Sequence, residues 1–344
     1  MTSSAAAPRK ASAFQYIQPA RRRATQYEEI TLHTQWDPKN FAAQGWFNYD
    51  ARGRPIWSDE STLLRSPDWW AYRDPQGEWF RPFVRRQVDT GRAIEQAVAS
   101  AGRAGLFAAF DPQWLDFLGG HYGAYRYAEY GLFMALCQAQ REAGSDVIAQ
   151  PIVFQAVEKD RHAQDITLYG LALEQHIPGF SDSGCKALWL TAPEWQPARR
   201  LVELLLAARD WGEINIVINC LVEPLFSTLF NRELVLRNAP RHGDPVTPAV
   251  AGGAEADRAL RRDTTRAFTQ LLCAQDGANR DVINAWLLHW QGHAFAACEA
   301  LAPLFAALPR AAVSFDEAYG RVRAEYRQIC RDLDLSLLEE VAHD

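Results

Sequence analysis

The stretch QAVEKDRHAQD, residues 155–165, decides how the rest of the chain is interpreted. It lies inside residues 152–174, whose apolar side chains recur at helical spacing and predict one long helix. In helical bundles that hold two metal ions, a Glu and a His three residues apart point from one helix toward the metals. Here His162 is present, but Lys159 stands where that Glu would be. The stretch therefore predicts a helical bundle whose metal chemistry has been altered or given up.

Helical patterns continue on both sides of this stretch. Apolar residues at spacings of three and four run through residues 91–110, 114–144, 198–230, 256–273, 280–305 and 315–333. Prolines and glycines break the pattern at 176–197 and at 240–253, which we predict to be a connector and a loop. Sustained strand alternation, GxGxxG and GxxxxGK[ST] are all absent from the sequence. These features predict an all-α bundle.

The N-terminal part of the chain has a different character. It is rich in Pro, Gly and Asp and contains six of the twelve Trp residues, namely Trp36, Trp46, Trp57, Trp69, Trp70 and Trp79. An extended arm cannot bury six indole rings within itself, so either a partner or the chain's own helices must cover them. We predict a mostly irregular, partner-wrapping arm at 1–88, with a short strand in 24–34, and a helical domain at 89–344.

Composition excludes several classes of protein. The 344 residues are 48% hydrophobic, carry a net charge of −6 and have a pI near 5.8, and Arg is scattered, so we expect no nucleic-acid partner. The N-terminus lacks the apolar segment of a signal peptide, and we find no uninterrupted apolar run of about 18 residues. Six Cys lie far apart without a CxxC pair, which favours reduced thiols. We expect a cytoplasmic protein that does not span a membrane.

Other candidate chemistry is weaker. His289 and His293 have the spacing of metal ligands on a helix, but Trp286 and Trp290 share that segment and favour a packed aromatic helix. The sequence contains no GxSxG nucleophile elbow. Nucleophilic catalysis therefore has no support.

A family resemblance rests on four stretches in the order in which they occur. They are SPDWWAYRDP (66–75), EKDRHAQD (158–165), DWGEINIVINCLVEPL (210–225) and NRDVINAWLLHWQGHA (279–294). Together they resemble the β subunit, a ferritin-like subunit, of the hydroxylase in bacterial multicomponent di-iron monooxygenases, nearest to the propane and alkene branch. The resemblance implies a ferritin-like bundle. In that family the iron-bearing α subunit is a paralogue of β.

Set against the iron-bearing paralogue, the metal ligands of this chain are degenerate. The resemblance assigns its ligand positions to Glu129, Lys159, His162, Glu213, Arg258 and Arg261. Glu129 and Glu213 keep carboxylates and His162 keeps the imidazole, whereas Lys159 replaces one Glu. Arg258 and Arg261 replace the second Glu-x-x-His pair. A metal beside these cations would be repelled, so we predict buried pairs of the cations with Glu129 and Glu213, or else ordinary surface pairs.

The resemblance implies a required but non-catalytic subunit of an NADH-dependent hydrocarbon monooxygenase that oxidises propane or small alkenes. Toluene or phenol oxidation is the alternative within the family. This chain would hold no cofactor and no metal. The di-iron centre would belong to the α subunit, and FAD and a [2Fe–2S] cluster to a reductase. Further partners would be a second β copy, a γ subunit in some members, and an effector protein.

We also predict which residues contact a partner: Trp46, Trp69, Trp70, Trp79, Asp210 and Trp211. Two readings from other classes stay open on sequence grounds. One is a stand-alone ferritin-like metal oxidase built on Glu129, His162 and Glu213, and the other is a helical interaction protein unrelated to oxygenases.

Overall fold

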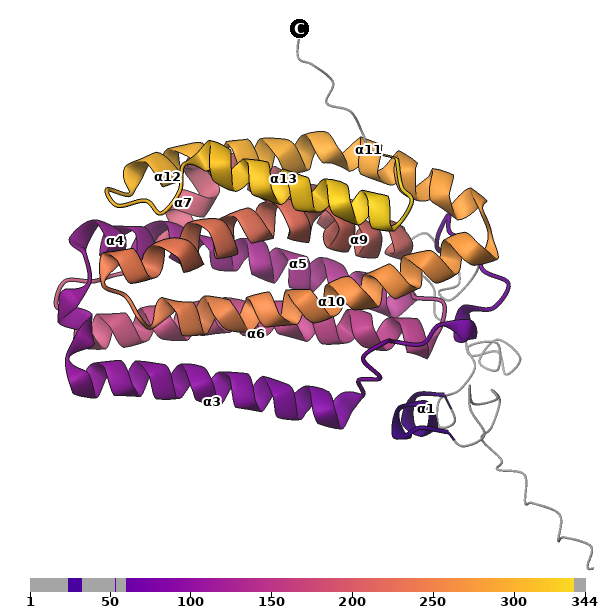
Figure 1. Cartoon of the computed structure of the whole chain (residues 1–344), viewed down its shortest axis with the longest axis horizontal. Coiled ribbons are helices and arrows are strands. Elements are labelled where there is room, and N and C mark those ends of the chain that lie inside the picture. The colour runs from indigo at the N-terminus through magenta and orange to yellow at the C-terminus, as the bar shows by residue number, and fades with distance from the viewer. Residues whose placement is uncertain (1–23, 33–52, 54–59, 337–344) are drawn as a thin grey trace, which may run out of the picture.

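The computed structural model describes residues 24–32, 53 and 60–336, and in this part of the chain every regular element is a helix. The longer helices lie along one axis (Figure 1) and are α3 (Phe80–Ala104), α5 (Gly123–Glu142), α6 (Asp146–His176), α8 (Gln196–Ala207), α10 (Thr247–Gln275), α11 (Ala278–Glu299) and α13 (Phe315–Asp332). The short helices are α1 (Gln26–Thr31), α4 (Pro112–Phe117), α7 (Cys185–Thr191) and α12 (Ala302–Ala307), with single turns at η1 (Trp69–Ala71), η2 (Leu106–Ala109), η3 (Leu118–Tyr122) and η5 (Ala239–His242).

One helix is unusual in its hydrogen bonding. α9 (Trp211–Val217) continues into η4 (Ile218–Leu236), a π-helical stretch of 19 residues, a conformation that is usually limited to single turns at functional sites. Pro224 has no N–H to donate, and the Thr228 hydroxyl donates to the carbonyl of Glu223 at 2.7 Å. The helix is long and apolar enough to cross a membrane, but 94% of its most apolar window is buried inside the bundle. It is the central core helix.

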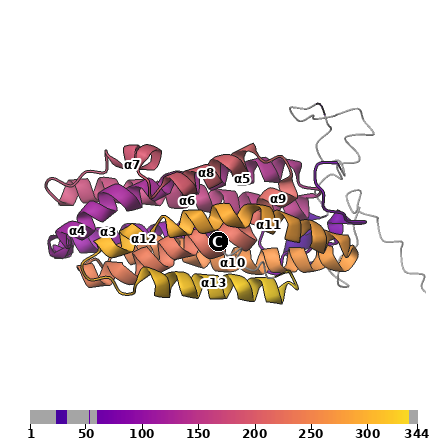
Figure 2. The same cartoon turned by 90° about the horizontal axis from the view of Figure 1, so that it is seen from above.

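Four elements form a closed ring around the core. α6 packs against α5 and α10, α10 packs against η4, and α5 packs against α9, which closes the ring. Outside it, α3 runs beside α6 and α10, whereas α11 and α13 cover η4 (Figures 1 and 2). The second view places α5, α7 and α8 on the side of the bundle opposite to α10 and α13. The all-α, ferritin-like prediction is confirmed.

The predicted boundary at residue 88 falls within a helix. α3 begins at Phe80, so residue 88 lies inside a continuous helix, and Trp79 is its N-cap residue. The short strand expected in 24–34 is wrong. Thr25 and Glu28 form a reciprocal capping box, in which each side chain accepts from the other's backbone N–H, and this starts helix α1 instead.

The loop predicted at 240–253 is shorter than expected, because α10 begins at Thr247. Pro248 occupies the first turn of the helix, where its missing N–H costs nothing. Gly253 lies within α10, and a Cβ there would come within 2.7 Å of the Thr90 side chain on α3. This glycine therefore serves the close approach of two helices rather than a turn. The predicted connector likewise contains helix α7.

Candidate functional site

The four central helices carry charged side chains into the middle of the bundle. Glu129 on α5 and His162 on α6 are 0% exposed, and Lys159 on α6 is 4% exposed. Glu223 on η4 and Arg258 on α10 are almost as deeply buried. Burying a charge is strongly unfavourable unless a partner compensates it, so the contacts between these groups determine what the site is.

Lys159 occupies the centre of the cluster. Its Nζ lies 2.7 Å from Glu223 Oε1, 3.2 Å from Glu129 Oε2 and 3.3 Å from Glu129 Oε1. One ammonium group thus bridges a carboxylate from α5 and a carboxylate from η4. The predicted pairing of Lys159 with Glu129 is thus present in the structure.

Glu129 is surrounded by partners that favour its ionised form. The Tyr125 hydroxyl donates to Oε1 at 2.6 Å, and His162 Nδ1 lies 3.1 Å from Oε2. Burial alone would raise the pKa of the Glu129 carboxyl, but Lys159 and His162, helped by Arg258, hold this pKa well below its ordinary value. Glu129 is therefore a carboxylate at neutral pH in spite of its burial.

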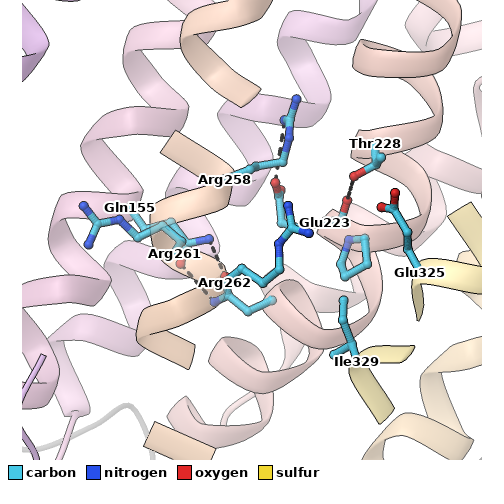
Figure 3. A pocket seen from close by; sticks show the side chains of 10 residues that line it. Gln155, Glu223, Thr228, Arg258, Arg261, Arg262, Glu325 and Ile329 are labelled. Carbon is cyan, nitrogen blue, oxygen red and sulfur yellow. Dashed lines mark hydrogen bonds and ion pairs between the residues drawn. The ribbon is translucent and has the colours of Figure 1, made fainter. Parts of the chain in front are cut away.

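Arg258 approaches the cluster from α10. Its guanidinium pairs with Glu255 one turn earlier, and its Nη1 lies 3.7 Å from Glu223 Oε2, so that Arg258 and Glu223 point toward one another (Figure 3). Burial would lower the pKa of Arg258, but the surrounding carboxylates raise it well above its ordinary value. A cavity of about 20 Å³ lies beside these two residues, also lined by Gln155 and Thr228, and has room for about one water.

Arg261 belongs to a second ion network, which corrects its predicted pairing with Glu129 and Glu213. Its Nε donates to Glu158 Oε2 at 2.9 Å, and its Nη2 donates to Glu158 Oε1 at 2.8 Å and to Glu78 Oε2 at 2.6 Å. Arg86 on α3 contacts both of these carboxylates, at 2.7 Å and 2.9 Å. This network joins α3, α6 and α10 to the segment that precedes α3.

The second carboxylate of the centre is Glu223 and not Glu213, which corrects the predicted pairing with Glu213. Glu213 is partly exposed, and its Oε1 accepts a 2.7 Å hydrogen bond from the indole N–H of Trp290. Sequence reasoning missed Glu223, although one signal was available. Between residues 214 and 230 it is the sole charged residue in an otherwise apolar or neutral run, and a lone carboxylate in a core helix needs a buried cation.

Two of the predicted partner contacts make contacts within this chain: Trp211 is a core residue, and Asp210 is partly exposed. Trp211 is 1% exposed, and its ring lies 5.4 Å from that of Trp69. Asp210 caps α9 and accepts from the backbone N–H of Leu63 at 2.6 Å. Trp69, Trp70 and Trp79 are partly exposed, whereas Trp36, Trp46 and Trp57 lie outside the described residues.

The two α11 histidines serve aromatic packing. Their rings meet the indole of Trp290 edge-on, with centroids 5.6 Å away for His289 and 6.2 Å away for His293. This is the packed aromatic helix that the sequence favoured.

A second feature was not apparent from the sequence. α5 and α6 leave an outward face that bears exposed apolar side chains, namely Tyr130, Met134, Val157, Leu168 and Leu171. Tyr130 and Leu168 line a surface hollow of about 470 Å³, and its charged lining residues, Arg126 and Asp160, each have a partner within the chain. An apolar face of this kind on a protein surface is typical of a protein interface.

The centre does not fit a pair of metal ions. Two such ions need several carboxylates to balance their charge, whereas here an ammonium lies between the two available carboxylates and a guanidinium stands behind one of them. Within the described part of the chain, the His, Cys, Asp and Glu side chains form no group of three or more arranged to hold a metal.

Comparison with known proteins agrees with this architecture. The family described as Methane/Phenol/Alkene Hydroxylase matches residues 46–276. The small subunit of the propane 2-monooxygenase hydroxylase component from Mycolicibacterium goodii is 32% identical over 96% of this chain and 91% of its own length. The methane monooxygenase component A beta chain of Methylosinus trichosporium is 32% identical over 85% of this chain and 77% of its own length.

Among solved structures, a xenon-pressurised phenol hydroxylase from Pseudomonas sp. OX1 superimposes with a TM-score of 0.79 at 19% identity and covers 98% of both chains, which shows the shared fold. This chain therefore belongs to the methane, phenol and alkene hydroxylase family. Within that family it is a β, or small, subunit of the hydroxylase of a multicomponent monooxygenase.

Proposed function

We propose that this chain is the structural, non-catalytic β subunit of an NADH-dependent hydrocarbon monooxygenase, with propane or a small alkene as substrate. The observation that carries the proposal is the Lys159 ammonium between Glu129 and Glu223, because a cationic side chain already neutralises the carboxylates that a metal ion would need. The small subunit of a propane 2-monooxygenase, similar over nearly the whole length, supports the choice of substrate.

In this proposal the chemistry belongs to other components. A di-iron centre in the α subunit supplies oxygen activation, and a reductase with FAD and a [2Fe–2S] cluster supplies electrons from NADH. An effector protein, a second β copy and, in some members, a γ subunit complete a cytoplasmic assembly. The task of this chain is mechanical. Its two buried ion networks and aromatic core make a rigid helical support for the α subunit.

We propose that the α subunit covers the face formed by α5 and α6, which we call the α5–α6 face and define by Tyr130, Met134, Val157, Leu168 and Leu171. Around the hollow, Arg126 pairs with Asp182 and Asp160 accepts a hydrogen bond from the Gln164 amide, so the exposed apolar side chains are free to meet an apolar partner surface. Because the similar proteins are small subunits of hydroxylase components, the large subunit of the same component is the partner expected here.

The test is to express this chain alone and together with the α subunit, and to measure iron and activity. We expect no stoichiometric iron in the isolated chain, iron in the complex, and propane oxidation that needs NADH, the reductase and the effector. A panel of propane, propene, toluene and phenol separates the substrate branches. Stoichiometric iron in the isolated chain, or oxidation by the α subunit without this chain, would overturn the proposal.

A further inference from the structure

Lys159 is an unusual choice of residue for this position. The sequence contains 4 Lys and 32 Arg, so Arg is the ordinary cation of this protein. Lys159 is 4% exposed, whereas Lys186, the other Lys in the described part of the chain, is exposed. A Lys ammonium is a compact point charge with three N–H donors, whereas an Arg guanidinium is a broad, planar fork. The centre thus holds the cation that is closest in shape to a single small ion.

Carboxylate oxygens surround this ammonium group, and one of them, Glu129 Oε1, accepts a hydrogen bond from it. Three carboxylate oxygens lie within 3.3 Å of Nζ, two from Glu129 and one from Glu223. Each carboxylate is itself held in place, since Tyr125 donates to Glu129 and the Ser227 hydroxyl donates to Glu223 at 3.1 Å. This is a built coordination site, not a chance contact between long side chains.

We propose that Glu129 and Glu223 form a site for one primary ammonium group, which Lys159 fills permanently as an internal cation. In this role the ammonium joins α5, α6 and η4, as a bound ion would, and makes the subunit's folding independent of metal supply. Arg258, 3.7 Å from Glu223, places a second cationic side chain beside this carboxylate. The inference rests on the geometry of this chain alone and stands or falls separately from the assignment to an oxygenase.

The first experiment separates charge from packing with Lys159→Met, which retains an unbranched side chain of nearly the same length and removes the charge. Leaving two carboxylates buried without their cation should lower the Tm at pH 7 by roughly 4–7 °C. Lys186→Met is the matched control and should leave the Tm unchanged. The triple variant Lys159→Met, Glu129→Gln and Glu223→Gln removes both the cation and its counter-charges and should recover most of the loss.

The pH dependence gives an independent readout. The titratable and charged groups around Nζ are Tyr125 and Glu129 from α5, His162 from α6, Glu223 from η4 and Arg258 from α10. In Lys159→Met the Glu129 carboxyl loses the ammonium that lowers its pKa most, so acidification from pH 7 to pH 5 should narrow the Tm gap to the unchanged protein. A Lys159→Met variant as stable as the unchanged protein at pH 7, or a triple variant no better than Lys159→Met, overturns the proposal.

The second experiment asks whether the vacated site selects an ammonium. Lys159→Ala leaves space beside both carboxylates, and methylammonium or ethylammonium chloride should raise its Tm more than that of the unchanged protein or of Lys186→Ala. Tetramethylammonium, which has no N–H donor, should give no such gain. Equal effects of the alkylammonium salts on all three proteins, or a gain produced by manganese or zinc chloride instead, would show that the site does not select an ammonium.

Discussion

Glu158 and Lys159 are neighbours in sequence, yet their side chains enter two different buried ion networks. Glu158 accepts from Arg261 and Arg86, whereas Lys159 lies between Glu129 and Glu223. Successive residues of a helix point about a quarter turn apart. Glu158 can therefore face α3 and α10, while Lys159 on the same turn of α6 faces α5 and η4. α6 thereby connects the two networks that hold the bundle together.

Restoring the missing carboxylate should not restore a metal centre. We expect Lys159→Glu to bind no di-iron centre, because Arg258 remains 3.7 Å from Glu223 and Arg261 remains in place of a ligand. Three buried carboxylates without a central cation should also lower stability. Iron analysis and absorption spectra of the purified Lys159→Glu variant test for a metal centre, and Lys186→Glu is the control. An absorbing centre that reacts with O2 would contradict it.

The acid stability of the protein should depend on Glu129. The pKa of Glu129 in the folded chain lies well below that of an unfolded Glu, about 4.3. Its stabilising contribution is therefore complete above that unfolded value and is lost as the pH falls through the folded pKa. We expect urea midpoints between pH 3 and pH 7 to fall less steeply for Glu129→Gln than for the unchanged protein. Glu203→Gln, in an exposed pair with Arg199, should keep the original slope.

Arg261 should be one of the most sensitive positions in the chain. Arg261→Ala leaves Glu158 and Glu78 with one cation between them, and removing one partner of a buried pair costs roughly 3–5 kcal/mol. Arg261→Lys should recover only part of this loss, because an ammonium cannot reproduce the two parallel hydrogen bonds to Glu158. Arg262→Ala, at the exposed neighbouring position, is the control. Equal unfolding free energies for Arg261→Ala and Arg262→Ala would refute this prediction.

The α5–α6 face should control assembly and leave the fold intact. Leu168 is 62% exposed, so Leu168→Ser should not lower the Tm of the isolated chain but should weaken binding to the α subunit at least tenfold. Leu288→Ser on α11, 54% exposed, is the matched control and should bind normally. Analytical ultracentrifugation of each variant mixed with the α subunit measures the binding, and thermal unfolding of the isolated variants measures the Tm. Normal assembly of Leu168→Ser would remove this face from the interface.

Substitution of Trp70 tests whether the N-terminal segment contacts a partner. Trp70 is partly exposed and lies next to Trp69, whose ring packs on Trp211 inside the chain. We therefore expect Trp70→Ala to weaken assembly with little change in Tm, and Trp69→Ala to lower the Tm as well because it removes an internal contact. Thermal unfolding and gel filtration of both variants separate the two effects. Oligomers of normal size in both would exclude the arm tryptophans as partner contacts.

Sequence by itself determined the all-α architecture, because the periodicity of apolar residues is a local property that each helix displays in its own segment. Helical spacing also singled out His162 with Lys159 three residues before it, and the family resemblance placed Arg258 and Arg261 at ligand positions. These features were enough to predict that the cations pair with carboxylates, either inside the bundle or at its surface.

Only the tertiary structure decided which carboxylates they meet. Glu223 and Glu213 lie on one continuous helix, and the π-helical path of η4 sets which side chains of that helix face α6, so sequence spacing could not choose between them. The partners of Arg261 are Glu78, which is 183 residues away in sequence, and Glu158, which lies on another helix. Such pairings depend on how helices rotate and pack against each other, which no single segment of the sequence encodes.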